Sequence, residues 1–461
     1  MSRKLLWRSL AFVLICMVLI KAFFSPKFDA EKILEESTLK ERSFAGEAVE
    51  INAFGDKLKA YFMEEHSVPI VAVNFGFEKA GKAYEKKEGV VLLAETSVLD
   101  GAGPFSRKEL REVMKEKGIH ISVSAGNDNL NFSLSYVKKF EKDAWDILKA
   151  VLYEPRLEES DLSLTKQQLA AERVRQFESP SYHLGRLVDE YFYQDHPYGK
   201  DSIPTDEVLH KISAEDIRAY LKEAMSKDNF YAGIAGDLTR DEAKAFLEYV
   251  FDGLKDNREE WTLPEWTPDF SMPKVEKELS FSAQSFVLMA GRGIKRLDDD
   301  FYPLYIANDI FGGSGLNSRL NKAIREKEGL TYGIYSYFSN SDAVDLWQIS
   351  FSAAPGNAEK VLEMAVAEYQ NFYDKGVTKA ELDQAKKSLL SSFNLRFSTL
   401  SNIAGMLREM QRQGLGIDFL AKRQGMVSEV ELEAVNRAIK NKMPKSLNHK
   451  GGIRVFEVSG K

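Results

Sequence analysis

The chain has 461 residues, of which 44% are hydrophobic and 29% are charged, and this composition is typical of a globular protein with more than one domain. Beyond residue 24, 59 lysines and arginines stand against 70 acidic residues, a net charge of −11, which argues against a nucleic-acid-binding protein because such proteins carry a basic surface. The only cysteine is Cys16, so the rest of the chain offers neither an internal disulfide nor a thiolate metal site.

Residues 1–24 have the pattern of an export segment. They contain four basic residues and no acidic residue, and residues 10–20 form an unbroken apolar run. Such a run is typical of the apolar part of a secretory signal and is short for a membrane span. Because no small-residue cleavage pattern follows, the segment is either a cleaved signal peptide or an uncleaved membrane anchor. Both interpretations place the body of the protein outside the cytoplasm, in a periplasm.

In the first half of the chain, short strand patterns alternate with helical patterns. Two apolar runs, 58–63 and 70–77, are joined by the polar segment EEHSVP, which predicts a β-hairpin. Ser106, followed on the next turn by Glu109, predicts a capped helix that ends at Gly118. The other predicted elements are helices at 88–99, 140–152 and 158–177, a hairpin of 119–125 and 130–136, a turn at HPYG (196–199), a helix from 213, a strand at 230–235 and a helix after Asp237.

The second half repeats this order of elements. Residues 256–275 contain three prolines and two tryptophans and are predicted to be a linker between the halves. Related patterns recur at an offset of about 210–220 residues, which favours one duplicated fold over two unrelated domains. Strands mixed with paired helices predict an α+β class. The predicted elements are strands at 281–290, 330–338 and 346–353 and helices at 302–311, 317–327, 358–373 and 379–397.

The stretch 311–338 contains the most specific arrangement of polar groups in the sequence. Its glycine-rich start, GGSG (312–315), predicts either a plain turn or a flexible loop that allows close approach. Gly329 is expected to end the following helix as its C-terminal cap. Arg325 would then lie on the last turn of that helix and Tyr332 at the start of the next strand. A helix that turns back through one glycine can bring these two side chains to the same place.

The order and spacing of these patterns resemble the insulinase/pitrilysin-like metallopeptidases, the inverzincin family that includes mitochondrial processing peptidase. The resemblance covers nearly all of residues 45–445. It implies two tandem α+β halves, 45–255 and 276–461, that face each other like a clam-shell around a substrate chamber. The matching segments are EEHSVP, GVVLLAETSVLDGAG, HPYG, the strand that ends in Gly236-Asp237, FGGSGLNSRL and REKEGLTYGIYS.

The first half departs from the family where active members bind zinc. Those members carry H-x-x-E-H, in which two histidines one helical turn apart hold the metal and the glutamate is the general base. Here Leu92 and Thr96 stand at the histidine positions, and Glu95 is the remnant of the base position. Glu172 best matches the family's third ligand, but one carboxylate cannot replace two imidazoles. The resemblance therefore implies no catalytic residue, metal or cofactor in this chain alone.

The second half keeps the pair with which the family holds its substrate. In the family, an arginine and a tyrosine in this context reach the active site of the facing first half and hold the peptide near the scissile bond. Arg325 and Tyr332 match these positions. Their spacing alone is also that of a helix-end cation and a half-buried strand tyrosine, but the resemblance assigns both to substrate binding. Glu95, Glu172 and His196 have ordinary structural interpretations as helix-surface or loop residues.

Some members of the family divide the work between two chains, one with H-x-x-E-H and one with the arginine and tyrosine. This sequence resembles the second kind. The resemblance thus implies a non-catalytic, substrate-binding subunit for exported peptides, whose partner is a homologous H-x-x-E-H subunit that carries the zinc. Two alternatives stay open: a proteolytically inactive scaffold with the same fold, and an independent hydrolase with a site that the sequence does not reveal.

Overall fold

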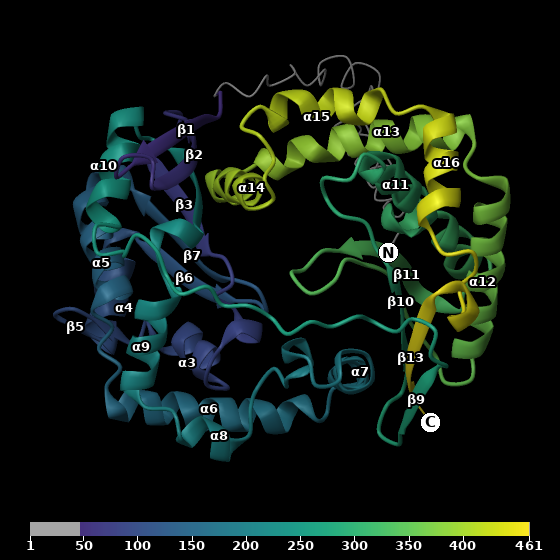
Figure 1. The fold of residues 1–461 in the computed structure, drawn as a ribbon, viewed down its shortest axis with the longest axis horizontal. Coiled ribbons are helices and arrows are strands. Elements are labelled where there is room, and N and C mark those ends of the chain that lie inside the picture. Colours follow the sequence, from purple (N-terminus) through teal and green to yellow (C-terminus); the bar gives the residue numbers. More distant parts are fainter. Residues whose placement is uncertain (1–46, 461) are drawn as a thin grey trace, which may run out of the picture. The chain divides into compact units, whose positions relative to one another are not determined.

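The computed structural model describes residues 47–460, and the predicted export segment 1–24 lies outside the described residues. Within 47–460, none of the helices combines the length and the apolar composition that a membrane span requires. Two mostly antiparallel sheets with helices against them make up this part of the chain (Figure 1). The α+β class predicted from the sequence is confirmed.

The first sheet has the strand order β1-β2-β8-β3-β7-β6, and helices α5 and α10 pack against one of its faces. The strands are β1 (Val49–Ala53), β2 (Leu58–Glu64), β3 (Ile70–Phe77), β6 (His120–Ala125), β7 (Leu130–Val137) and β8 (Phe230–Gly236), with the short pair β4 (Gly101–Ala102) and β5 (Phe105–Ser106) outside the sheet. The helices of this part are α3 (Val90–Ser97), α4 (Arg107–Lys117), α5 (Glu141–Tyr153), α6 (Glu159–Gln176), α7 (Pro180–Val188), α8 (Asp206–His210), α9 (Ala214–Ala224) and α10 (Arg240–Val250).

The hairpin predicted for 58–63 and 70–77 is wrong. These runs form β2 and β3, but β8 lies between them, parallel to β2 and antiparallel to β3. All seven residues of β8 are buried, so a strand from far along the chain occupies the most protected place in the sheet. The EEHSVP segment spans β8, and its Glu65 N–H donates to the Gly236 carbonyl at 3.0 Å. Apolar periodicity identifies strands but does not identify their neighbours.

The second sheet has the order β11-β12-β10-β13-β9, with the last strand of the chain, β13, parallel to β9. The sequence reasoning missed β9, β13, α7, α14, α15 and α16, and it began β10 four residues too early. The strands are β9 (Val275–Leu279), β10 (Ser285–Arg292), β11 (Thr331–Ser339), β12 (Leu346–Ala353) and β13 (Ile453–Gly460). The helices are α11 (Phe301–Asn308), α12 (Ala358–Lys375), α13 (Lys379–Asn394), α14 (Leu400–Arg412), α15 (Phe419–Ser428) and α16 (Leu432–Lys442).

The glycine-rich stretch 312–315 is a turn between helical segments, in which Gly312 and Gly313 end a π-helical turn and Gly315, with a φ of +61°, begins a short 3₁₀ turn. Helix α11 continues into a π-helical turn, Asp309–Gly313, and the following helical segment, Asn321–Glu326, is also π-wound. The expected close approach is present, because a Cβ on Gly312 would lie 2.4 Å from the Ser336 Oγ. Glycine is needed there for contact between the turn and β11 rather than for mobility.

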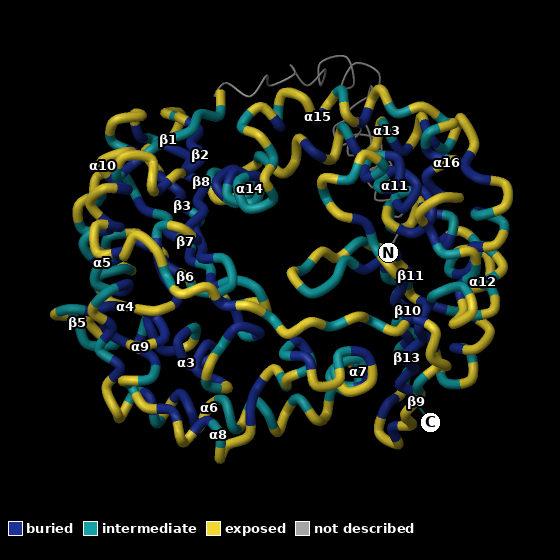
Figure 2. Tube along the Cα trace, in the orientation of Figure 1, coloured by how far each residue is buried: buried dark blue, intermediate teal, exposed yellow. Residues whose placement is uncertain are grey.

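Each sheet packs against a helix from the other half of the sequence. Helix α14 lies on β2, β3 and β8, where Ile403 and Leu407 share a buried cluster with Tyr61 (Figures 1 and 2). Helix α7 lies on β9, β10 and β13, where Leu187 is buried with Phe456. This exchange joins the two halves through apolar cores.

We expect Gly233→Ala to disturb the packing of α14 on the first sheet and so to lower the stability of the protein. The added methyl carbon would lie 2.1 Å from the Ala404 carbonyl oxygen, and backbone on both sides leaves it no room. Overpacking of this kind costs about 1–3 kcal/mol of unfolding free energy. Gly185→Ala is the matched control, since nothing lies within 4 Å of a methyl group there. Thermal unfolding of both variants checks the prediction, and equal midpoints would contradict the packing described.

Candidate functional site

A buried asparagine holds the turn that carries Arg325 and Tyr332. The Asn321 side chain donates to the Ile334 carbonyl at 2.6 Å and accepts the Ile334 N–H at 3.2 Å. It also donates to the Gly315 carbonyl at 3.0 Å, and its exposed fraction is 0%. One amide therefore fixes the helical segment, the glycine turn and β11 relative to one another. The sequence reasoning missed Asn321, although a polar residue directly after buried Leu320 was a usable signal.

The expected cap at Gly329 is confirmed, with a φ of +65° and an N–H that donates to the Arg325 carbonyl at 3.0 Å. The register of β11 against β12 then shifts between Thr331 and Ile334, so Tyr332 lies in a β-bulge. A bulge re-aims side chains, and the Tyr332 side chain is 82% exposed while Arg325 is half-buried. Among the described residues, neither side chain has a hydrogen-bond or ion-pair partner, and the two do not bond to each other. Both polar ends are free to meet a ligand.

Leu92 and Thr96, which stand where active members have their zinc-binding histidines, both lie on α3 but in different environments. Leu92 is buried, with an exposed fraction of 7%. Thr96 is exposed, and its hydroxyl donates back to the Leu92 carbonyl at 2.8 Å. The Glu95 carboxylate lies 3.7 Å from the Lys82 Nζ, and Glu172 on α6 is paired with Arg175. The arrangement is a hydrophobic contact and two ion pairs rather than a metal centre.

A cavity of about 500 Å³ adjoins Leu92 and is lined by residues from α3, α7 and the HPYG turn. Burial raises the pKa of Asp189 to about 6, although the Arg186 guanidinium donates to this carboxylate at 2.9 Å and opposes the shift. Burial also raises the pKa of Glu85, against the opposing N–H of Gly89 at 3.0 Å. The sequence reasoning missed these cavity residues because α7 was not predicted. The charged lining residues are Lys82, Glu85, Arg186, Asp189, Lys200 and Asp201.

His196, in the HPYG turn, has a structural role. It is 5% exposed, and its Nδ1 accepts the Tyr198 N–H at 3.3 Å. Its ring lies 5.3 Å from that of Trp266, centre to centre, and burial lowers its pKa. A neutral imidazole held in an aromatic cluster stabilises the turn and is not positioned as a metal ligand.

The residues at the metal position of α3 do not fit zinc, which requires at least three protein ligands from histidine, cysteine or carboxylate. A leucine side chain supplies no donor atom, and the Thr96 hydroxyl already donates to a backbone carbonyl. Residues 47–460 contain no cluster of three or more histidine, cysteine, aspartate or glutamate side chains that could hold a metal.

We expect the purified chain, free of any affinity tag, to hold no stoichiometric zinc, as measured by elemental analysis after dialysis. The double variant Leu92→His with Thr96→His supplies two imidazoles one helical turn apart and is expected to gain zinc affinity. It is not expected to gain efficient turnover, because efficient turnover also depends on surrounding groups that orient the ligands, and the two substitutions do not supply these. One tightly held zinc in each unmodified chain would contradict this account of α3.

Two family models match this sequence. Residues 64–206 match the model described as Insulinase (Peptidase family M16), and residues 211–389 match the Peptidase M16 inactive domain. A Helicobacter pylori protein named non-peptidase homolog YmxG is 25% identical over 388 residues, which span 83% of this chain and 89% of that protein. A Bacillus subtilis protein named uncharacterized zinc protease YmxG is 22% identical over 364 residues, 77% of this chain and 85% of that protein.

The fold is also similar to that of solved structures. The peptidase M16 inactive domain from Pseudomonas fluorescens matches with a TM-score of 0.81 at 23% sequence identity, over 90% of this chain and 97% of that one. The similarity in fold agrees with the two family models, and the zinc motif is replaced on α3. This chain is a member of the insulinase family, peptidase family M16, and an inactive homologue within it.

Proposed function

We propose that this chain is the non-catalytic, substrate-binding subunit of a heterodimeric zinc metallopeptidase. One observation carries the proposal. Arg325 and Tyr332 have free polar ends on a turn that hydrogen bonds hold in place, whereas Leu92 and Thr96 replace the two zinc-binding histidines of active members. A chain with no role in proteolysis has no need to keep both substrate-holding groups exposed. The partner would be a homologous H-x-x-E-H subunit, which supplies the zinc, its water and the general base.

In this proposal the chain has two peptidase-like halves with different roles. The first half, 45–255, carries the degenerate metal position, and the second half, 276–461, carries the substrate-holding pair, with 256–275 as the linker. Arg325 would bind the peptide through its planar donors. The Tyr332 hydroxyl would donate to the scissile carbonyl oxygen as negative charge develops on it. Hydrolysis is expected only in the assembled complex.

Co-purification tests the proposal. The full chain, tagged at its C-terminus and expressed from its own promoter, is isolated from the native cell under gentle conditions, and associated proteins are identified. The expected result is a roughly equimolar H-x-x-E-H homologue, together with peptidase activity that a zinc chelator abolishes. A chain that purifies alone, with no peptidase homologue at any salt concentration, would contradict the proposal.

A second candidate is a proteolytically inactive scaffold with the same fold, which the name non-peptidase homolog of the Helicobacter pylori relative favours. The two candidates differ in the role of Tyr332. In a scaffold, loss of its hydroxyl changes no reaction, whereas in a peptidase subunit it slows cleavage.

We further propose that the protein works outside the cytoplasm, as the export pattern of residues 1–24 suggests. Fusion of residues 1–40 to a reporter that is active only after export checks this, and an inactive reporter would refute it. The mobility of the mature chain on a gel then distinguishes a cleaved signal from an anchor.

A further inference from the structure

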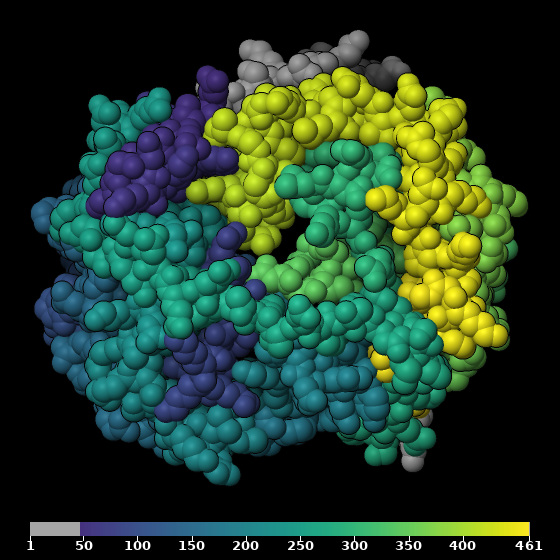
Figure 3. Space-filling view, viewed as in Figure 1, coloured from purple at the N-terminus to yellow at the C-terminus, as the bar shows by residue number. Residues whose placement is uncertain are grey.

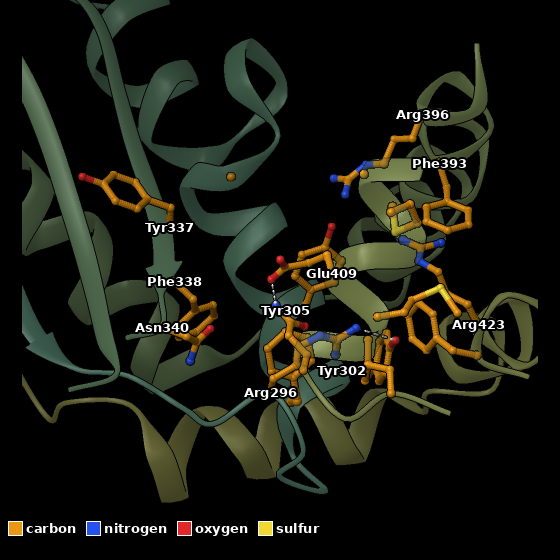
Figure 4. A pocket seen from close by; sticks show the side chains of 18 of the residues that line it. Arg296, Tyr302, Tyr305, Tyr337, Phe338, Asn340, Phe393, Arg396, Glu409 and Arg423 are labelled. Atoms are coloured by element: carbon orange, nitrogen blue, oxygen red, sulfur yellow. Dashed lines mark hydrogen bonds between the residues drawn. The ribbon is translucent and has the colours of Figure 1, made fainter. Parts of the chain in front are cut away.

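A second cavity, of about 920 Å³, lies in the second half between α11, β11, α14 and α15 (Figure 4). The surface beside α14 is hollowed on the face shown in Figure 3. Four arginines line the cavity, and we call it the arginine cavity. They are Arg296, Arg396, Arg408 and Arg423.

Aromatic rings hold two of these guanidinium groups in place. Arg423 is 6% exposed, and its guanidinium lies 3.7 Å from the centre of the Phe393 ring. The Arg296 guanidinium lies 4.1 Å from the centre of the Phe301 ring and donates to the Tyr302 hydroxyl at 3.1 Å. Stacking fixes the plane of a guanidinium and leaves its N–H edge available to an acceptor.

The four arginines lack acidic partners. Among the described residues, none of them forms an ion pair with an aspartate or glutamate, and the Arg408 Nε is buried with no hydrogen-bond partner. Burial, and to a smaller extent the charge of Arg396, lower the pKa of Arg423, against an opposing side-chain hydrogen bond with Tyr305. Burying a guanidinium without a counter-charge costs folding free energy, and binding of a negatively charged group in the cavity would offset this cost.

The two acids in the cavity wall do not balance the four arginines. Glu409 accepts from the Arg412 guanidinium, at 2.6 Å for the closer contact, and from Gln413 at 2.6 Å. The Asp309 carboxyl has no ion-pair partner in the described part of the chain, and burial alone raises its pKa to about 6. The ionised Asp309 offsets at most one of the four positive charges at neutral pH, so the cavity keeps a surplus of positive charge that an anionic ligand would match.

The size of the cavity favours a peptide as the source of that anion. Its volume is near the upper end of drug-sized binding sites, roughly 300–1,000 Å³, and is far larger than one inorganic ion needs. One wall is formed by Ser336, Tyr337 and Phe338 of β11. The outer backbone edge of β11 is already occupied here, because the Ser336 carbonyl accepts from the Asn308 side chain at 3.1 Å, so this wall offers side chains rather than strand pairing.

We propose that the arginine cavity binds an acidic peptide segment. Its aspartate or glutamate carboxylates pair with Arg396 and Arg423, and its chain lies against the cavity wall that β11 forms. Carboxylates match the planar fork of arginine and form two parallel hydrogen bonds with it. This inference rests on the peptide-binding role proposed above and names the class of peptide that the subunit selects.

Binding to the full chain alone tests this inference by fluorescence anisotropy at physiological ionic strength. The probes are a labelled peptide of alternating glutamate and alanine and the same peptide with glutamine for glutamate. We expect the glutamate peptide to bind at least about tenfold more tightly than the glutamine peptide, the effect of one charge-assisted hydrogen bond. Equal affinity for the two peptides, or binding of inorganic phosphate without binding of the glutamate peptide, would overturn the proposal.

Two variants and a matched control locate the site. Arg396→Gln removes an exposed guanidinium from the cavity, and Arg423→Lys keeps the charge but removes the planar fork and its stacking on Phe393. Each is expected to weaken binding of the glutamate peptide about tenfold. Arg437→Gln, an exposed arginine on α16 outside the cavity, loses the same charge and is expected to bind like the wild type. Equal losses in Arg396→Gln and Arg437→Gln would show non-specific attraction and refute the site.

The peptide-binding experiment and the test of the heterodimer can fail independently of each other. Anisotropy needs no partner subunit, so failure to assemble a heterodimer neither creates nor hides peptide binding. If the assembled complex cleaves peptides and depends on Tyr332, but the acidic peptide does not bind, only the arginine cavity proposal fails.

Discussion

Tyr332→Phe is expected to lower kcat of the assembled complex by about 10²- to 10³-fold, the loss measured for removal of one oxyanion-hole donor. The change deletes one hydroxyl from a side chain that is 82% exposed and has no partner among the described residues. Folding and assembly should therefore be intact. The measurement is peptide cleavage by the variant reconstituted with the wild-type partner, after the complex has been confirmed by size.

Tyr335→Phe is the matched control for this substitution. Tyr335 lies on the same strand and is 43% exposed, and it is not assigned a role in catalysis. Its complex is expected to cleave at the wild-type rate. If both variants cleave as the wild type does, Tyr332 is structural and the scaffold function is favoured.

Arg325→Ala is expected to act mainly on substrate binding and to raise KM by about 10- to 100-fold, because a hydrogen bond to a charged group contributes roughly 1.5–3 kcal/mol. The Arg325 side chain has no ion-pair partner within residues 47–460, so its removal leaves no buried acid without a counter-charge. Arg325→Lys should restore little if the planar fork is what binds the peptide. Steady-state kinetics of the reconstituted complexes separate KM from kcat.

Lys322→Ala controls for loss of positive charge from the same helical segment, since Lys322 is exposed there. It is expected to leave KM unchanged. A KM for Arg325→Ala that equals the KM of this control would remove Arg325 from the substrate site.

The features that the sequence predicted well are those set by local chemistry. The helix that begins after Ser106 has the expected capping box with Glu109 and ends at Gly118, whose φ is +62°. Gly329 likewise ends its helical segment as expected. Caps depend on a few neighbouring residues, so a single sequence is sufficient to find them.

The features that the sequence did not predict depend on contacts between distant segments. The position of β8 between β2 and β3, and the packing of α14 on the first sheet, join residues more than 150 positions apart. The arginine cavity is also assembled from distant segments, since Arg296 precedes α11 and Arg423 lies on α15. No local pattern marks residues as members of one cavity before the fold is known.

The candidate site could be predicted from the sequence in part. The resemblance to the family singled out Arg325 and Tyr332, and the structure shows how the sequence positions them. The amide of Asn321 joins the helical segment to β11, and the bulge after Thr331 turns Tyr332 outward. The roles of Arg325 and Tyr332 in binding a substrate stay predictions.

The most direct test of the heterodimer is a cleavage assay on three samples: this chain alone, its co-purified H-x-x-E-H homologue alone, and the two mixed in equal amounts. The substrate is a quenched fluorescent peptide, and all samples contain the same zinc concentration. The account predicts negligible cleavage by either chain alone and zinc-dependent cleavage by the mixture, lost again with Tyr332→Phe. Cleavage by the homologue alone at the same rate as by the mixture would contradict it.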